Sequence, residues 1–357
     1  MRYTVSMRSL CCLPLLLIGI GFAGCSVDRV THRPVSTTAT RSVIVDRVDY
    51  KGWPGAWRLR SQSCELIVLP AISRVMHLST PGGPNLLWEN PTLAGQTFPA
   101  DDGTWHNIGG EKLWPTQQKD LFKKYTGHDG WPPPWPWDAG ASVAEPIAGG
   151  VRLTLPHDSR FGAHAVREFT LDPEKPIVHV RQWIEKTEGE PAEMTVWTVC
   201  QVNNPLLSLI PSADGKYADF GTHSDLMMAK AGYATVGRDE KQGLKIGIAA
   251  SGQNGWVASV FADGPTNRVM LVQSHKLQAD AKYPDDGLQA ELYTSPKDFA
   301  FYTEMELLSP LVKMKAGARL EDYAIWQLVP VNGSDPAAIA RRAHEEALRA
   351  IGPAGEK

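Results

Sequence analysis

Tryptophan is concentrated in one part of this chain. Eight of the 12 tryptophans lie between Trp53 and Trp137, and three occur in the segment Trp131-Pro-Pro-Pro-Trp135-Pro-Trp137-Asp138. Proline disfavours helices and central strands, so this segment is predicted to be a stiff loop that presents indole rings. An indole has a large apolar face and one N–H donor, which suits a pyranose ring. The three tryptophans and Asp138 are therefore candidate carbohydrate contacts; alternatively, the indoles only close one end of the core.

Charged residues in other parts of the chain offer further candidate contacts. Glu111 and Lys112 are adjacent in a stretch bounded by glycine, which is predicted to be a loop. They either contact a sugar hydroxyl or a uronate, or form a salt bridge within the loop. Arg181, together with Arg160 and Arg167, is a candidate bidentate partner for the carboxylate of a uronate.

Strand parity predicts a second polar feature. Successive side chains of a strand point to opposite faces of a sheet, so several predicted strands have one core face and one face of mixed aromatic, amide and charged groups. We expect this second face to be concave, partly covered and able to hold a sugar; an exposed flat face remains the alternative, because parity does not report curvature. The residues assigned to such faces include Trp183, Trp197, Gln201, Glu291, Tyr293, Tyr302, Glu304 and Glu306.

The elements that must position these residues are strands. Between residues 43 and 330, short β-rich segments recur and are separated by Gly, Pro and Asp turns, with no sustained helical period. The predicted class is all-β, as one large antiparallel supersandwich. The predicted strands are Glu65–Leu69, Val75–Leu78, Val151–Leu155, Val166–Leu171, Ile177–Lys186, Met194–Val202, Leu244–Ala250, Trp256–Ala262, Arg268–His275, Leu288–Tyr293, Phe301–Leu307 and Tyr323–Val329.

One helix is predicted near the C-terminus. Ser334-Asp335 can cap it, Pro336 suits its first turn and Gly352-Pro353 ends it. Its apolar residues recur at i, i+4 spacing and form a narrow stripe that can pack on a sheet. The predicted organisation is a signal peptide over residues 1–24, a polar tether over 25–42, the β-domain over 43–330, and the helix and tail over 331–357.

The N-terminus has the pattern of a secretory signal. Arg2 and Arg8 precede an apolar stretch from Leu10 to Ala23, which is short for a membrane span of about 20 residues. Small residues directly before Cys25 resemble a bacterial lipoprotein signal, in which this cysteine is acylated. The resemblance implies a cell-envelope protein anchored by lipid, in the outer membrane and facing the periplasm. The alternative is an ordinary cleaved signal with an incidental cysteine.

Charge and cysteine content limit the other functions. Removal of residues 1–24 takes away two arginines and no acidic residue, so the formal charge moves from −3 to −5. That balance gives no electrostatic reason to bind nucleic acid. Cys64 and Cys200 form either a disulfide or two buried free thiols. No metal-ligand spacing or nucleotide-binding motif is evident, so we expect neither a metal nor a cofactor.

The early part of the chain resembles the opening of mutarotase-like domains. This resemblance rests on Trp53-Pro-Gly-Ala-Trp57, on Glu65-Leu-Ile-Val-Leu-Pro70 followed by Arg74-Val-Met, and on Asn85-Leu-Leu-Trp88-Glu-Asn90. Gly109-Gly-Glu-Lys-Leu-Trp-Pro115, with Gln117, resembles the signature of a bacterial galactose-mutarotase-like family that is a domain of unknown function. In that comparison Trp114 and Gln117 become candidate sugar contacts.

The closing part of the domain carries the same resemblance. Tyr302-Thr-Glu-Met-Glu-Leu-Leu-Ser-Pro310 is similar to the last strands of the mutarotase-like fold. The resemblance implies no single reaction, because members of the wider superfamily include aldose epimerases, polysaccharide lyases and sugar-binding modules. In the epimerase reaction, a carboxylate takes the proton of the anomeric hydroxyl and a histidine protonates the ring oxygen. Glu304 is the preferred carboxylate. The segment 198–205 has no histidine at the expected place, so His106 is proposed as a substitute, with His157 and His164 as alternatives.

Three functions remain after this comparison. The first is carbohydrate binding by a lipid-anchored protein, with the sugar stacked on the tryptophan segment over the polar sheet face. The second is an enzyme acting on a sugar, either an epimerase that uses Glu304 and a histidine or a lyase. The third is an interaction module of the cell envelope, in which the tryptophan segment docks a protein. A fold alone does not decide among them.

Overall fold

The computed structural model describes residues 42–100, 104–118, 133–212, 217–220, 227–230, 232–237, 241–249 and 254–351. The chain divides into one unit over Met1–Thr40 and a second over Arg41–Lys357. All the described residues belong to the second unit. The predicted signal peptide, Cys25 and Trp131 lie outside the described residues.

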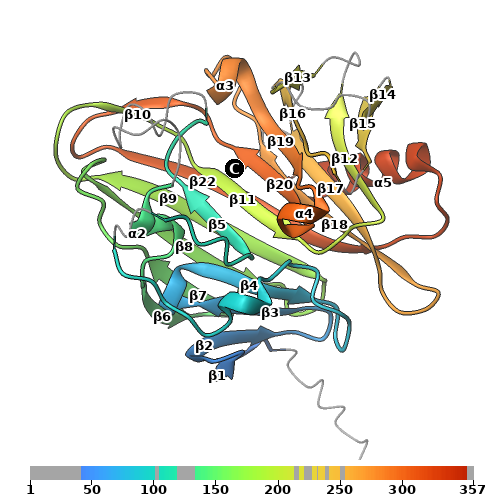
Figure 1. The fold of residues 1–357 in the computed structure, drawn as a ribbon, viewed down its shortest axis with the longest axis horizontal. Coiled ribbons are helices and arrows are strands. Elements are labelled where there is room, and N and C mark those ends of the chain that lie inside the picture. Colours follow the sequence, from blue (N-terminus) through green and yellow to red (C-terminus); the bar gives the residue numbers. More distant parts are fainter. Residues whose placement is uncertain are drawn as a thin grey trace, which may run out of the picture. The chain divides into compact units, whose positions relative to one another are not determined.

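Ten antiparallel strands form the first sheet (Figure 1). Its central strands come from distant parts of the sequence, so residues more than 100 positions apart become neighbours. In spatial order the strands are β1 (Ile44–Tyr50), β2 (Trp53–Arg60), β3 (Glu65–Leu69), β4 (Arg74–Ser79), β5 (Glu111–Trp114), β11 (Trp197–Val202), β20 (Thr303–Leu308), β19 (Leu288–Thr294), β16 (Leu244–Ala249) and β13 (Ala218–Asp219).

A second sheet also has ten antiparallel strands, and a separate pair joins β10 (Ala192–Met194) to β21 (Val312–Met314). In spatial order the strands of the second sheet are β14 (Met227–Lys230), β15 (Gly232–Val236), β12 (Leu207–Ser212), β17 (Asn254–Ala262), β18 (Arg268–Lys276), β22 (Arg319–Pro330), β9 (Ile177–Lys186), β8 (Ala163–Leu171), β7 (Gly150–Thr154) and β6 (Val143–Ile147).

The main hydrophobic core lies between the two sheets. Leu113 and Met305 from the first sheet belong to the same buried cluster as Phe169 and Trp326 from the second. Alternate residues of these strands are apolar, which is why one face of each sheet is buried against the other. Cys64 and Cys200 are both buried, free thiols.

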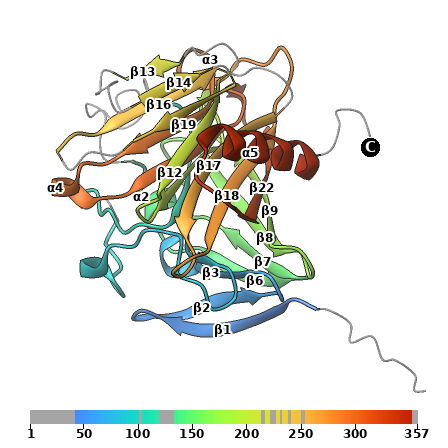
Figure 2. The ribbon, with the colours of Figure 1, turned by 90° about the vertical axis from the view of Figure 1, so that its right-hand side faces the viewer.

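Within the described ranges, helices are few and mostly short. α5 (Pro336–Ile351) lies against β17 and β18 (Figure 2). Ile339 and Ala343 on its apolar stripe pack in a cluster with Trp256. Asp335 caps the helix by accepting from the backbone of the next turn. The others are η1 (Pro70–Ile72), η2 (Pro91–Leu93), α2 (Trp135–Asp138), α3 (Pro284–Gly287) and α4 (Lys297–Ala300).

The predicted all-β class and the terminal helix are confirmed. Two local predictions are wrong. The segment Glu111–Trp114 is a central strand instead of a loop, and Trp135–Asp138 is one helical turn, because Pro136 occupies a first-turn position where its missing N–H costs nothing. None of the helices among the described residues is both long and apolar enough to span a membrane.

Candidate functional site

Strand register gathers polar side chains on the face of the first sheet that points away from the second. Val199 on β11 pairs with Lys112 on one side and Glu306 on the other, while Gln201 pairs with Glu304. The next strands continue the pattern, because side chains directly across a ladder share a face. The members of this polar face are Lys112, Trp114, Trp197, Gln201, Lys245, Glu291, Tyr293, Glu304 and Glu306.

The Glu306 half of this face is a closed ion-pair network. Lys245 Nζ lies 2.9 Å from both oxygens of Glu306 and 2.8 Å from Oε2 of Glu291. The Trp197 indole N–H donates to Glu306 Oε2 at 2.7 Å. Burial disfavours the charge on Lys245, but the two carboxylates outweigh it and raise the pKa of Lys245. Burial likewise raises the pKa of Glu291 to about 8. Both oxygens of Glu306 are thus held by the protein itself.

The Glu304 half is more open. Gln201 Nε2 donates to Glu304 Oε1 at 3.0 Å and to Asn107 Oδ1 at 2.8 Å. Lys112 Nζ lies 3.8 Å from the same Oε1. Oε2 takes part in none of the hydrogen bonds and ion pairs found among the described residues, and the side chain is 12% exposed. Burial raises the pKa of Glu304. Glu304 is therefore a carboxylate with one oxygen available to a ligand.

A second buried network holds the ring of Trp114. Its indole N–H donates to Asp138 Oδ1 at 2.9 Å, and Arg74 Nη2 pairs with Asp138 Oδ2 at 2.9 Å. Arg74 also donates to the carbonyl of Gly109 at 2.6 Å. Lys112 Nζ lies over the Trp114 ring, 5.1 Å from its centroid. Asp138 thus orients the indole of Trp114.

Aromatic rings flank Glu304. The rings of Trp88 and Tyr302 have centroids 4.7 Å apart, and Tyr293 follows 6.1 Å from Tyr302. Tyr293 is the register partner of Glu304. Trp88 and Tyr293 are partly exposed, whereas Tyr302 is buried. An apolar ring surface beside a polar hydrogen-bonding group is the combination that a sugar ring requires.

The tryptophan segment has a different arrangement from the one predicted. Trp137 is fully buried, and its indole N–H donates to the carbonyl of Pro156. Its ring has no face available to a ligand, so the expected stacking role of Trp137 is corrected to a core role. Trp135 is partly buried and packs against a small cluster that includes Trp53 and Ile72. The contact predicted for Trp131 lies outside the described residues.

Glu111 lies apart from the other predicted contacts. It is fully buried on the opposite, core-facing side of β5, where it pairs with Arg167 on β8. Lys112 is its chain neighbour but points to the polar face, because alternate residues of a strand face opposite ways. The predicted sugar contact of Glu111 and the loop salt bridge are therefore both replaced by an ion pair between the sheets.

The remaining arginines are also engaged elsewhere. Arg181 on β9 pairs with Glu321 at 2.6 Å, and Arg160 pairs with Asp158 at 2.8 Å. Trp183 shares the second sheet with Arg181, so the expectation that Trp183 and Trp197 belong to one polar face is wrong. The described structure does not bring these residues to the Glu304 face.

The candidate histidines and Gln117 contact residues other than Glu304. The His106 ring stacks on Phe98 with centroids 3.6 Å apart, and it is the next residue, Asn107, that joins the network of Glu304. His157 pairs with Glu188, and His164 with Glu185. Gln117 Oε1 accepts from the backbone N–H of Asp285 in α3.

Three polar residues of the site were missed from the sequence. Lys245 alternates with Leu244 and Ile246 on β16, so strand parity alone places it on the polar face. Arg74 and Asn107 follow no such pattern. Arg74 starts β4 with a fully buried guanidinium, and Asn107 lies outside the strands. Only the three-dimensional arrangement brings these two to the site.

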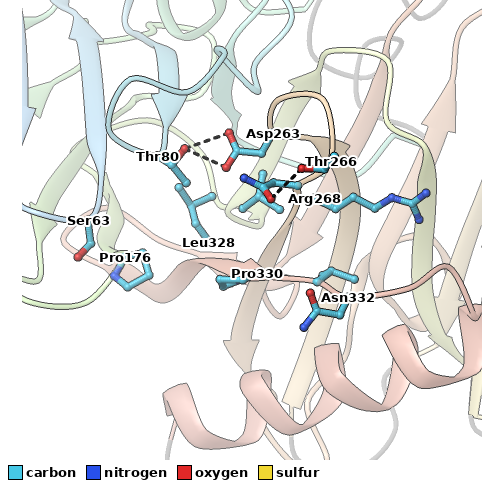
Figure 3. Close-up of a pocket in the computed structure, with 12 residues that line it drawn as sticks. Ser63, Thr80, Pro176, Asp263, Thr266, Arg268, Leu328, Pro330 and Asn332 are labelled. Atoms are coloured by element: carbon cyan, nitrogen blue, oxygen red, sulfur yellow. Dashed lines mark hydrogen bonds between the residues drawn. The ribbon is translucent and has the colours of Figure 1, made fainter.

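A cavity of about 360 Å³ lies away from the polar face, between the ends of β4, β17, β18 and β22. The hydroxyl of Thr80 donates to the Asp263 carboxylate, while Arg268 extends away from that pair (Figure 3). The Thr80–Asp263 contact ties two turns together, so we regard the cavity as structural. Among the described residues, no group of three or more His, Cys, Asp or Glu side chains is placed to hold a metal ion.

Comparison with solved structures identifies the fold of this domain. A galactose mutarotase-like protein from Lactobacillus casei matches with a TM-score of 0.50 and 10% identity, over 77% of this chain and 100% of that one. A proposed aldose 1-epimerase from Klebsiella pneumoniae matches with a TM-score of 0.53 and 10% identity, over 88% of each chain. No family model and no curated protein matches the sequence. The domain has a galactose mutarotase-like fold.

Proposed function

We propose that the polar face of the first sheet binds a carbohydrate. The observation that carries this proposal is that Glu304, which has one free carboxylate oxygen, pairs in register with the partly exposed Tyr293. The partly exposed Trp88 packs against the neighbouring Tyr302. The carboxylate accepts hydrogen bonds from sugar hydroxyls, and the rings contact the C–H face of the pyranose. The proposed site thus moves from the tryptophan segment to the Trp88 side of the sheet.

A specific observation favours an enzyme as the second candidate. Burial raises the pKa of Glu304, which brings a carboxylate closer to the range in which it exchanges protons at neutral pH. A base of this kind is what anomeric epimerisation requires. The proteins of similar fold include one named as a proposed aldose 1-epimerase, which agrees with this candidate.

Calorimetric titration of the full chain with neutral hexoses, beginning with D-galactose and D-glucose, tests the binding proposal. Glu304→Gln is expected to weaken binding about tenfold or more, equivalent to about 1.4 kcal/mol. Glu145→Gln is the matched control, because Glu145 is 58% exposed on β6. Binding that is equally strong in both variants would contradict the role of Glu304. Anomer exchange measured by NMR on the same samples separates a binder from an epimerase.

We further propose that the protein is anchored in the bacterial envelope by acylation of Cys25. The support is the sequence pattern of an apolar stretch that ends in small residues before this cysteine. Cys25→Ser is expected to move the protein from the membrane fraction to the soluble fraction, because lipid chains supply the membrane affinity. Unchanged fractionation of Cys25→Ser would contradict the anchor.

A further inference from the structure

We infer that Lys112 is a positioning residue of the Glu304 site, whose buried ammonium group keeps the neighbouring carboxylate ionised for contact with a sugar. This inference rests on the proposed carbohydrate site and adds a residue that acts through Glu304 instead of touching the ligand. It also explains why a lysine is placed where the protein interior makes a charge costly.

The geometry singles out Lys112 among the cations of the polar face. Its side chain is fully buried, its Nζ lies 3.8 Å from Glu304 Oε1, and it has no hydrogen-bond partner among the described residues. Lys245 is shared by Glu291 and Glu306. Arg74 is committed to the Asp138 carboxylate and to two backbone carbonyls. Among the described residues, Lys112 is the cation that forms an ion pair with Glu304.

The charged groups around Glu304 act on its pKa in opposite directions, and Lys112 has the largest lowering effect. Glu306, on the same strand as Glu304, raises the pKa of Glu304 by repulsion, whereas Lys112 and Lys245 lower it. The phenols that flank Glu304 stay neutral: burial raises the pKa of Tyr293 to about 12 and raises that of Tyr302 further. Without the Lys112 charge, burial and Glu306 repulsion would therefore be opposed only by Lys245, by the hydrogen bond from Gln201 and by the charge of Arg74.

The burial of Lys112 makes its charge easy to remove. Burial lowers the pKa of Lys112 to about 8; Glu304, Asp138 and Glu306 oppose that shift, while Arg74 adds to it. The ammonium charge is therefore present at neutral pH and is lost in mildly alkaline solution. An exposed lysine does not change charge in this range.

Carbon-13 NMR of glutamate carboxyl groups in the full chain tests the inference without any sugar. The Glu304 signal is assigned by its absence in Glu304→Gln. In the wild-type protein we expect this signal to show a further inflection near pH 8, as Lys112 titrates. In Lys112→Met we expect the pKa of Glu304 to rise by about 1–3 units, the usual effect of losing a nearby opposite charge. Lys112→Arg is expected to keep the Glu304 pKa close to its wild-type value.

The control is Lys282→Met, because Lys282 is 69% exposed and pairs with Glu193. A Glu304 titration that is the same in wild type and Lys112→Met would overturn the inference. If Lys112→Met does not fold, the wild-type curve decides: a single inflection, with none near pH 8, would overturn it. These results are independent of sugar titration, so failure of the carbohydrate proposal and failure of the Lys112 inference are separate outcomes.

Discussion

The carboxyl group of Glu291 has an unusual position, since it shares one lysine with Glu306 and is fully buried. Burial raises its pKa from 4.5 to about 8. Between these two values the folded protein binds more protons than the unfolded chain, so the free energy of unfolding falls as pH rises. Lys112 has the opposite effect: its lowered pKa makes the free energy of unfolding rise with pH above about 8.

We therefore expect Glu291→Gln to flatten the pH dependence of stability between pH 5 and pH 8. The amide cannot lose a proton, so the decline caused by Glu291 disappears. Urea denaturation at several pH values measures the effect, with the exposed Glu145→Gln as the control. The same slope in Glu291→Gln and wild type would show that Glu291 ionises normally.

At the scale of elements, one ion pair joins the two sheets. Glu111 on β5 and Arg167 on β8 are both fully buried, and Arg167 also donates to Gln182 on β9 at 3.1 Å. Removal of one partner leaves an uncompensated buried charge. Arg167→Met is therefore expected to lower the free energy of unfolding by about 3–5 kcal/mol, as seen by chemical denaturation.

The double variant Glu111→Gln with Arg167→Met distinguishes charge from packing. If the isolated carboxylate is the cause, the second substitution recovers much of the lost stability, because the buried charge is then gone. If the double variant is instead less stable than Arg167→Met, so that the two losses add, packing of the arginine side chain dominates.

Gly110 positions β5 against β4, and so positions Lys112 and Trp114. Its φ is +71°, and an added Cβ would lie 2.4 Å from the carbonyl oxygen of Val75. Gly82 is a matched control, because its φ is +73° but nothing lies within 4 Å of the added Cβ. Gly110→Ala is expected to be less stable than Gly82→Ala and to bind sugar more weakly. Equal unfolding midpoints in urea for the two variants would contradict the close approach.

At the scale of the whole molecule, residue periodicity is enough to predict the strands and their two faces, but not which strands pair with one another. Alternation on 197–203 and 301–307 correctly places Gln201 with Trp197, and Glu304 with Glu306, because parity is a local property. Which strands lie side by side depends on contacts between distant segments. For this reason the sequence does not show that Trp183 and Trp197 lie in different sheets, or that Arg74 and Asn107 belong to the site.

The tryptophan segment also shows what the sequence alone does not predict. Composition indicated an exposed aromatic surface, but proline at the first turn of a helix is favourable, and α2 carries Trp137 into the core. A partly exposed indole of this face is instead Trp88, which packs against Tyr302 and which a strand-pairing pattern does not reveal. Burial, which sequence composition does not report, decides which indoles are available to a ligand.

The most direct measurement compares sugar binding in Trp88→Ala and Trp135→Ala, by calorimetric titration of the full chain with D-galactose and D-glucose. A site beside Glu304 predicts that Trp88→Ala weakens binding about tenfold or more, while Trp135→Ala stays close to the wild-type affinity. Loss of binding in Trp135→Ala with full binding in Trp88→Ala would contradict the account and return the site to the tryptophan segment.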